Sequence, residues 1–154
     1  MKDFDISRYL GRWYEVGKLP FKWEPKQCVF SQATYGWDEK NRVMLVQNDC
    51  LNAERQVLDS RKGVAWVPEG EDIRNGHLKI RFNDGRPADP GGDYIVLFTD
   101  YSNYSFVGTP DKQLFWILSR NQRVPRKDLQ FILRKTKELG YDPDRVMSNP
   151  ANFI

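Results

Sequence analysis

Gly11-Arg12-Trp13-Tyr14-Glu15 opens the first predicted strand, and the fold prediction starts from this stretch. Residues 4–10, just before it, read as a short turn-like lid. The strand continues through Lys18 until Pro20 ends it, because proline has no backbone N–H for a strand ladder. A glycine two residues before a tryptophan occurs by chance in many chains. Alone, it indicates only a buried tryptophan on an edge strand.

The composition is that of one folded domain. A chain of 154 residues can bury most of the surface that it exposes when unfolded. Hydrophobic residues make up 40% and aromatic residues 14%, which favours a packed core over disorder. The formal net charge of +3 comes from basic and acidic residues spread along the chain, not from a basic patch. We therefore expect a single domain over residues 1–154 and no nucleic-acid partner.

From the sequence we expect neither a membrane-spanning helix nor a leader peptide. No run approaches the roughly 18 apolar residues that a spanning helix needs. Met1-Lys2-Asp3 leads straight into the domain, so no signal peptide is expected. Two alternatives stay open: a cytosolic protein, or the mature form of an exported or membrane-associated one.

Seven further segments have the alternation and the aromatic and β-branched content of strands. Turns rich in Gly, Pro, Asp and Asn separate them. These segments are residues 28–37, 42–50, 57–67, 78–82, 94–99, 104–108 and 113–119. Eight short strands with tight connections predict an all-β fold, an antiparallel up-and-down barrel over about residues 11–120. Such a barrel is just wide enough to be filled by side chains or to hold one small ligand.

One helix is predicted after the barrel, over about residues 125–140. Pro125 suits its first turn and Gly140 its C-terminal cap. Its apolar side recurs at helical spacing and should pack outside the barrel: Leu129, Ile132, Leu133, Thr136 and Leu139. Its basic face is expected to be solvated, the alternative being contact with lipid head groups or nucleic acid. The tail, residues 141–154, either lies along the barrel or is mobile.

Two later motifs join Gly11-x-Trp13. Thr99-Asp100-Tyr101 closes the sixth strand and Ser119-Arg120 closes the eighth. In this order, around eight strands and one late helix, the three motifs resemble the signature motifs of the lipocalin family over nearly the whole chain. Finer stretches are similar to bacterial outer-membrane lipocalins, plant temperature-induced lipocalins and apolipoprotein D: Arg12-Trp13-Tyr14-Glu15, Ala33-Thr34-Tyr35, Gly92-Asp93-Tyr94 and Phe115-Trp116-Ile117-Leu118-Ser119-Arg120.

The resemblance implies that the three motifs close one end of the lipocalin calyx. Trp13 would plug the barrel, and the Arg120 guanidinium would stack on its indole face. Asp100 would accept backbone N–H groups in the adjoining turn. The motif residues are therefore expected to stabilise the barrel and not to touch ligand: Gly11, Trp13, Thr99, Asp100, Tyr101 and Arg120.

Ligand binding is expected in the interior and at the opposite, open end. Alternation, aligned with the family's pattern, turns these side chains inward: Ala33, Tyr35, Leu45, Gln47, Ile80, Phe82, Tyr94, Val96, Val107 and Trp116. Tyr35, Gln47 and Tyr94 are candidates to orient a polar head group, the alternative being that each is satisfied locally. Glu15 shares the parity of Trp13 and can point inward, where a buried carboxylate would need a partner.

The two cysteines can form a disulfide. If the hairpin turns at residues 38–41, Ala33 pairs with Leu45, and Cys28 lies opposite Cys50 on the outer face. Directly opposite Cβ atoms are about 4.5–5.5 Å apart, slightly more than the roughly 3.8 Å of a cystine. A bridge is within reach with local strain and would imply an oxidising compartment. Two free thiols are the alternative.

The residues of common catalytic and metal sites are missing. His77 is the only histidine, which excludes a His-based triad or a multi-His metal site, and we expect it in an exposed turn. One histidine and two cysteines cannot complete a structural zinc shell, so neither metal nor cofactor is predicted. Prostaglandin D synthase is a lipocalin that acts through a pocket cysteine, but the outward parity of Cys28 argues against such catalysis.

The sequence therefore predicts binding, transport or sequestration of one hydrophobic ligand, a fatty acid or lysophospholipid, by a monomer or weak dimer. The acyl chain would lie inside, with an anionic head at the rim near Lys18, Lys22 or Lys26. A retinoid or haem is less favoured because aromatic side chains would crowd it. The alternatives are an enzyme acting on a lipophile, and an interaction module whose loop at residues 21–23 binds a partner or, peripherally, a membrane.

Overall fold

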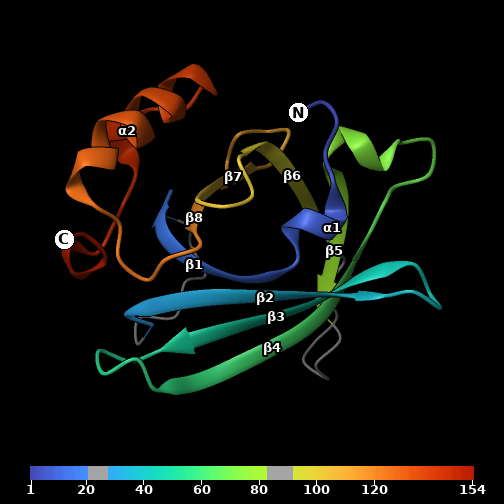
Figure 1. Ribbon diagram of the computed structural model, residues 1–154, viewed down its shortest axis with the longest axis horizontal. Helices are drawn as coiled ribbons and strands as arrows, with labels where there is room; N and C mark the ends of the chain where they lie inside the picture. Colours follow the sequence, from blue (N-terminus) through green and yellow to red (C-terminus); the bar gives the residue numbers. More distant parts are fainter. Residues whose placement is uncertain (21–27, 83–91) are drawn as a thin grey trace.

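The computed structural model describes residues 1–20, 28–82 and 92–154, and within them eight antiparallel strands close into a barrel in chain order (Figure 1). The strands are β1 (Gly11–Lys18), β2 (Phe30–Asp38), β3 (Val43–Leu51), β4 (Val57–Trp66), β5 (His77–Phe82), β6 (Gly92–Thr99), β7 (Tyr104–Gly108) and β8 (Phe115–Ser119). β8 pairs with β1, so the ring is closed and each strand is paired on both sides. The predicted up-and-down barrel is confirmed.

Short helical elements flank the barrel. The lid before β1 contains one helical turn, α1 (Ile6–Tyr9), and the 3-10 turn η1 (Ile73–Asn75) precedes β5. The predicted helix is a 3-10 turn, η2 (Arg126–Asp128), that continues as α2 (Leu129–Glu138) outside the barrel (Figure 1). Two further 3-10 turns follow, η3 (Pro143–Arg145) and η4 (Pro150–Asn152). No helix in the described part of the chain is both long and apolar enough to cross a membrane.

The strand pairings differ in length. Among the described residues β2 and β3 share nine residue pairs and β3 and β4 share eight. Every other pairing has four or five pairs. β2, β3 and β4, here called the ribbon, run across the lower part of Figure 1.

The register of the β2–β3 hairpin differs from the prediction. Asp38 is the last residue of β2 and pairs with Val43, because its carboxylate accepts the N–H of Asn41 and so places the turn at residues 39–42. Gly36 therefore pairs with Leu45, and the sum of paired positions is odd where an even one was predicted. An odd shift moves every side chain of a strand to the other face. The predicted inward positions of Leu45 and Gln47 are wrong.

The inward residues of β3 are Met44 and Val46, which are 0% and 3% exposed. Leu45 is 45% exposed on the outside. Gln47 also lies outside, where its amide donates to Asp49 at 3.1 Å. Neither of these two can line the interior.

A bulge in β1 changes its alternation. The register with β8 shifts between Glu15 and Gly17, so that Glu15 pairs with Leu118 but Lys18 pairs with Trp116. Leu118 and Trp116 belong to the interior cluster, and both Glu15 and Lys18 therefore turn inward although they are three residues apart. Val16 packs on the outer side of the wall. The extra residue of a bulge re-aims side chains in this way.

The wall of the barrel separates two apolar clusters among the described residues. The interior cluster is centred on Trp13, Tyr35, Val96 and Val107. The outer cluster lies between β1, β7, β8 and α2, where Ile132 and Thr136 are the buried residues of the helix. Leu129 and Leu133 of the predicted apolar face are 38% and 40% exposed.

The tail lies along the barrel, which decides between the two alternatives left open by the sequence. Met147 forms an isolated bridge to Lys18, and Phe153 forms one to Val124. The Tyr141 ring stacks on Phe115 with centroids 4.1 Å apart. The tail thereby covers the outer side of β1 near its C-terminal end.

Candidate functional site

Arg120 stabilises the closed end of the barrel. Its guanidinium carbon lies 3.8 Å from the Trp13 ring centroid, which is the stacking that the resemblance implies. It also donates to three carbonyl oxygens, of Tyr101 at 2.8 Å and of Arg12 and Arg8 at 3.0 Å each. Burial lowers the pKa of Arg120 from its ordinary value, but arginine stays charged in proteins.

Gly11 makes room for this arginine. Its φ of +104° lies in the left-handed region, and a Cβ there would sit 3.2 Å from the Arg120 Nη1 atom. A side chain at this position would be strained and would press on the guanidinium.

The turn after β6 is held by its own side chains. Asp100 accepts the N–H groups of Asn103 and Tyr104 at 2.8 Å each. The Thr99 hydroxyl donates to the Tyr104 carbonyl at 2.8 Å and accepts the Tyr101 N–H at 2.9 Å. The turn therefore presents the Tyr101 carbonyl to Arg120.

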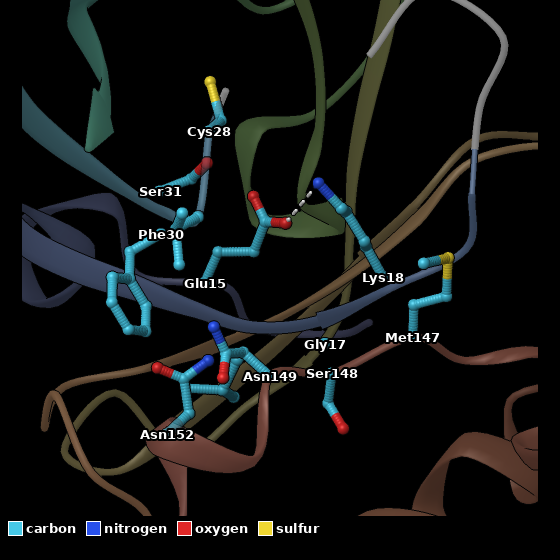
Figure 2. A pocket seen from close by; sticks show the side chains of 12 residues that line it. Glu15, Gly17, Lys18, Cys28, Phe30, Ser31, Met147, Ser148, Asn149 and Asn152 are labelled. Carbon is cyan, nitrogen blue, oxygen red and sulfur yellow. Dashed lines mark ion pairs between the residues drawn. The ribbon is translucent and has the colours of Figure 1, made fainter. Parts of the chain in front are cut away.

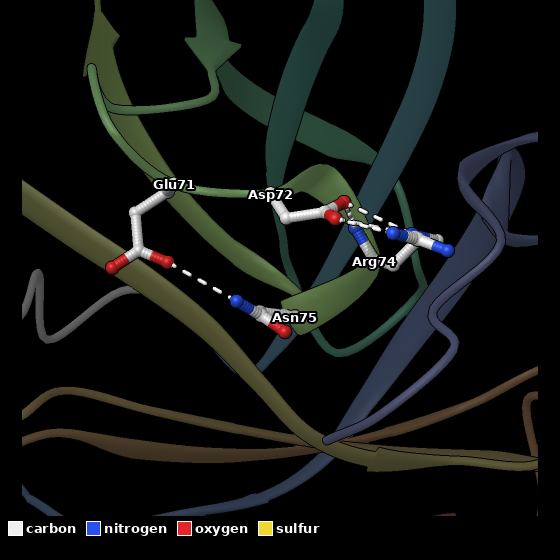
Figure 3. A network of polar contacts seen from close by, with 4 residues as sticks. All are labelled: Glu71, Asp72, Arg74 and Asn75. Atoms are coloured by element: carbon white, nitrogen blue, oxygen red, sulfur yellow. Dashed lines mark hydrogen bonds and ion pairs between the residues drawn. The ribbon is translucent and has the colours of Figure 1, made fainter.

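The residues before β1 complete the closed end. Tyr9 is fully buried, and its carbonyl accepts the indole N–H of Trp13 at 2.9 Å. Phe4 is 2% exposed and donates its N–H to the Arg74 carbonyl of η1 at 2.8 Å. Asp72 caps η1 and pairs with Arg74 at 2.7 Å, next to a weaker Glu71–Asn75 contact (Figure 3). The polar network of η1 thus supports the lid from outside.

Tyr35 and Tyr94, two predicted head-group contacts, belong to the barrel floor. We define the floor cluster as Tyr9, Tyr35, Tyr94 and Ser105. The Tyr94 hydroxyl lies 2.7 Å from that of Tyr9 and 2.9 Å from that of Tyr35, and Tyr9 lies 2.7 Å from the Ser105 hydroxyl. Burial raises the pKa of Tyr9 to about 12 and raises that of Tyr35 and Tyr94 above the ordinary value. The hydroxyls of Tyr35 and Tyr94 are thus hydrogen-bonded within the protein, which is the alternative to a head-group contact that the sequence left open.

The remaining predicted lining residues fall into two groups. Ala33, Val96 and Val107 are 7%, 0% and 0% exposed and pack into the interior cluster with the floor. Ile80, Phe82 and Trp116 pack against the edge of that cluster and are only partly buried. The apolar surface left uncovered inside the barrel is therefore nearer its open end.

Charged residues also turn inward there, which alternation alone did not reveal. Arg61 has the alternation of the buried Gly63 and Ala65, and its guanidinium carbon lies 4.5 Å from the Phe82 ring centroid. The Lys18 ammonium lies 3.3 Å from the Glu15 carboxylate, and their side chains are 18% and 19% exposed. Burial raises the pKa of Glu15 above its ordinary value, and the Lys18 charge opposes that rise. The predicted rim residues Lys22 and Lys26 lie outside the described residues.

A cleft of about 420 Å³, here called the side cleft, lies where β1 and β2 part (Figure 2). Their pairing ends with Tyr14 and Gln32, although β1 continues to Lys18 and β2 begins at Phe30. Its lining is Glu15, Val16, Gly17, Lys18, Cys28, Val29, Phe30, Ser31, Met147, Ser148, Asn149 and Asn152.

A disulfide joins Cys28 and Cys50, whose Cα atoms are 5.1 Å apart. The predicted placement directly opposite on the outer face is wrong, because Cys50 pairs with Ser31 and the bridge runs diagonally. Cys50 has the inward alternation of Met44 and Val46. The bridge ties the chain just before β2 to the end of β3, beside the side cleft.

No cluster of three or more metal-ligating side chains occurs within residues 1–20, 28–82 and 92–154. His77 is half-buried and not in an exposed turn as predicted. Its ring nitrogens lie 3.0 Å from Asp93 and 3.6 Å from Glu71, so its polar neighbours are carboxylates.

The sequence matches the family model of the lipocalin-like domain over residues 4–151. Temperature-induced lipocalin-1 of Arabidopsis thaliana is 28% identical, over 99% of this chain and 82% of that protein. Outer membrane lipoprotein Blc of Vibrio cholerae is 31% identical, over 96% and 82%. Apolipoprotein D of Cavia porcellus is 32% identical, over 85% and 68%.

Solved structures are similar in fold. Insecticyanin from the tobacco hornworm Manduca sexta has a TM-score of 0.74 at 26% identity and covers 97% of this chain and 82% of its own. The amine binding protein of Rhodnius prolixus, solved as a tryptamine complex, has a TM-score of 0.68 over 98% and 83%. At 17% identity, the latter likeness shows the fold alone.

Proposed function

The chain belongs to the lipocalin family, and from that membership we propose that it binds a fatty acid or a lysophospholipid inside its barrel. Lipocalins are binders and transporters of small hydrophobic molecules. The choice of an acyl-chain ligand is our inference from the interior of this barrel.

The observation that carries the proposal is the uncovered apolar surface above the floor cluster. Ile80 and Trp116 turn into the barrel but are only partly buried, and Phe82 beside Ile80 is partly buried with the Arg61 guanidinium over its ring. An acyl chain that covers such surface gains about 0.8 kcal/mol per buried methylene. The hydroxyls of the floor cluster hydrogen-bond to one another, so the bottom of the barrel is closed and these hydroxyls already have partners. A ligand therefore enters tail first.

The inward cations support an anionic ligand. Lys18 and Arg61 bring positive charge into the upper interior, where Glu15 pairs with Lys18 and Asp59 shares the alternation of Arg61. A carboxylate or phosphate head can be bound there by charge-assisted hydrogen bonds, which are about twice as strong as neutral ones. We retain Lys18 as a proposed contact of the anionic head, from its inward position in β1 and not from the rim.

The rival functions have less support. Catalysis like that of the lipocalin prostaglandin synthase needs a thiol, and both cysteines of this chain are joined in a disulfide. The loop proposed for an interaction module, residues 21–23, lies outside the described residues. Ligand transport or sequestration is therefore the function that we test first.

The test is calorimetric titration with saturated fatty acids and lysophospholipids of increasing chain length. Each methylene that enters the barrel should tighten binding roughly fourfold. Ile80→Trp should abolish binding, because the larger side chain fills the space next to Phe82 and Trp116.

Leu45→Trp is the matched control. Leu45 was also predicted to face inward but is 45% exposed on the outer wall, so the same aromatic group there should leave binding unchanged. Affinity independent of chain length, or binding that survives Ile80→Trp, would show that the barrel interior is not the binding site.

A further inference from the structure

We propose that the side cleft holds the head group of the bound lipid, and that this head is a phosphate ester contacted by Lys18. The proposal rests on the proposed function, because it assumes that the acyl chain lies in the barrel. It assigns the ligand an exit through the wall between β1 and β2, and not through the open end of the barrel.

The first step is the path through the wall. Glu15, Lys18 and Ser31 have inward positions in their strands, whereas Val16, Gly17 and Phe30 have outward ones. Both groups line the same cleft. A cleft shared by the two faces of a wall connects the interior with the surface. Among the described residues β1 and β2 do not pair beyond Tyr14 and Gln32, and the tail meets this end of β1 through the Lys18–Met147 bridge.

The second step is charge. Figure 2 shows the Glu15 and Lys18 side chains directed toward one another within the cleft, with their ion pair drawn. A largely buried ion pair offsets only part of the desolvation of its two charges. An entering anion can take over the Lys18 ammonium, because the four-carbon stem is flexible and the ammonium has three donors. Glu15 then holds the cation in place until the ligand arrives.

The third step is size and polarity. The volume of about 420 Å³ lies within the range of small-molecule sites, and a carboxylate alone would fill little of it. The outer part of the cleft offers polar groups beside the apolar Val29 and Met147, since Ser148, Asn149 and Asn152 line it from the tail. Hydroxyl and amide groups suit the ester and glycerol oxygens of a lysophospholipid better than a bare fatty acid.

The experiment compares two ligands that differ only in the phosphate. Lysophosphatidic acid and the monoacylglycerol of the same chain are titrated into the wild type, Lys18→Met and Lys62→Met. Lys62 lies on the outer face of β4 and is exposed, so its substitution removes one charge without touching the cleft. Lys18→Met should lower the affinity for lysophosphatidic acid about tenfold and leave the affinity for the monoacylglycerol unchanged. Lys62→Met should change neither affinity.

Glu15→Gln provides a second variant with the opposite sign. It removes the competing carboxylate and keeps the shape of the side chain, so lysophosphatidic acid should bind several-fold more tightly. Ser148→Trp should fill the outer part of the cleft and weaken lysophosphatidic acid more than a fatty acid of equal length.

The outcomes separate the two proposals. If Lys18→Met and Glu15→Gln leave lysophosphatidic acid binding unchanged while chain length still matters, the head lies elsewhere and only this inference is overturned. Equal losses for both ligands in Lys18→Met would also overturn it, because the effect would not involve the phosphate. If the wild type binds neither of these ligands nor a fatty acid of the same chain length, the proposed function fails as well.

Discussion

At the scale of single residues, Arg120 should be a determinant of stability and not of affinity. Arg120→Ala removes a cation–π contact and three hydrogen bonds to backbone carbonyls. We expect a loss of about 2–4 kcal/mol in the free energy of unfolding. Thermal denaturation should show a clearly lower Tm, with ligand affinity nearly unchanged. Arg123→Ala, at an exposed arginine, is the control, and equal stability of the two variants would contradict the assignment.

Glu15 gives a second prediction at this scale, from its proton equilibrium. Burial raises its folded-state pKa above the unfolded value of 4.5, so the group favours the folded state most below pH 4.5. That contribution is lost as pH rises through the folded pKa. Carboxyl resonances followed by NMR should show Glu15 titrating above its ordinary range.

Lys18→Met should raise the pKa of Glu15 further, because the Lys18 charge lowers it in the wild type. A wild-type Glu15 that titrates at or below 4.5, or one whose pKa does not respond to Lys18→Met, would show that the carboxylate is well solvated.

At the scale of elements, the disulfide that joins the chain just before β2 to the end of β3 should stabilise the domain. It spans a sequence separation of 22, for which the lost chain entropy of the unfolded state corresponds to about 3 kcal/mol. Cys28→Ser combined with Cys50→Ser should lower the midpoint of urea denaturation accordingly. The wild type in reductant should match the double variant, and an unshifted midpoint in both would refute this role.

Two element-scale features explain which site residues the sequence missed. The period of a strand is two, so a predicted β2–β3 pairing that was wrong by an odd number of residues exchanged Met44 and Val46 for Leu45 and Gln47. The Asp38 carboxylate, which accepts the N–H of Asn41, was the signal that could have placed the turn correctly. The β1 bulge that aims Lys18 inward depends on pairing with β8, about a hundred residues away, and has no local signal.

At the scale of the whole molecule, the fold could be predicted but the division of its interior could not. Trp13, Asp100 and Arg120 act within short motifs whose order along the chain is readable. Whether Tyr94 lines the site or belongs to the floor depends on Tyr9, which reaches it from the lid before β1. Such contacts join segments that are distant in the sequence. The alternation within a strand predicts only which face a side chain lies on, so it cannot predict these contacts.

The strand pairings contain unequal numbers of residue pairs, and this difference determines which parts of the barrel open most easily. The β2–β3–β4 ribbon has nine and eight residue pairs and is tied by the cystine, whereas β5 and β6 share four among the described residues. Local opening follows such differences in contact density. Amide hydrogens of the ribbon should therefore exchange with deuterated solvent only through global unfolding, and those of β5 and β6 through smaller fluctuations. The ribbon would then remain the fixed wall of the ligand site while the shorter strands move.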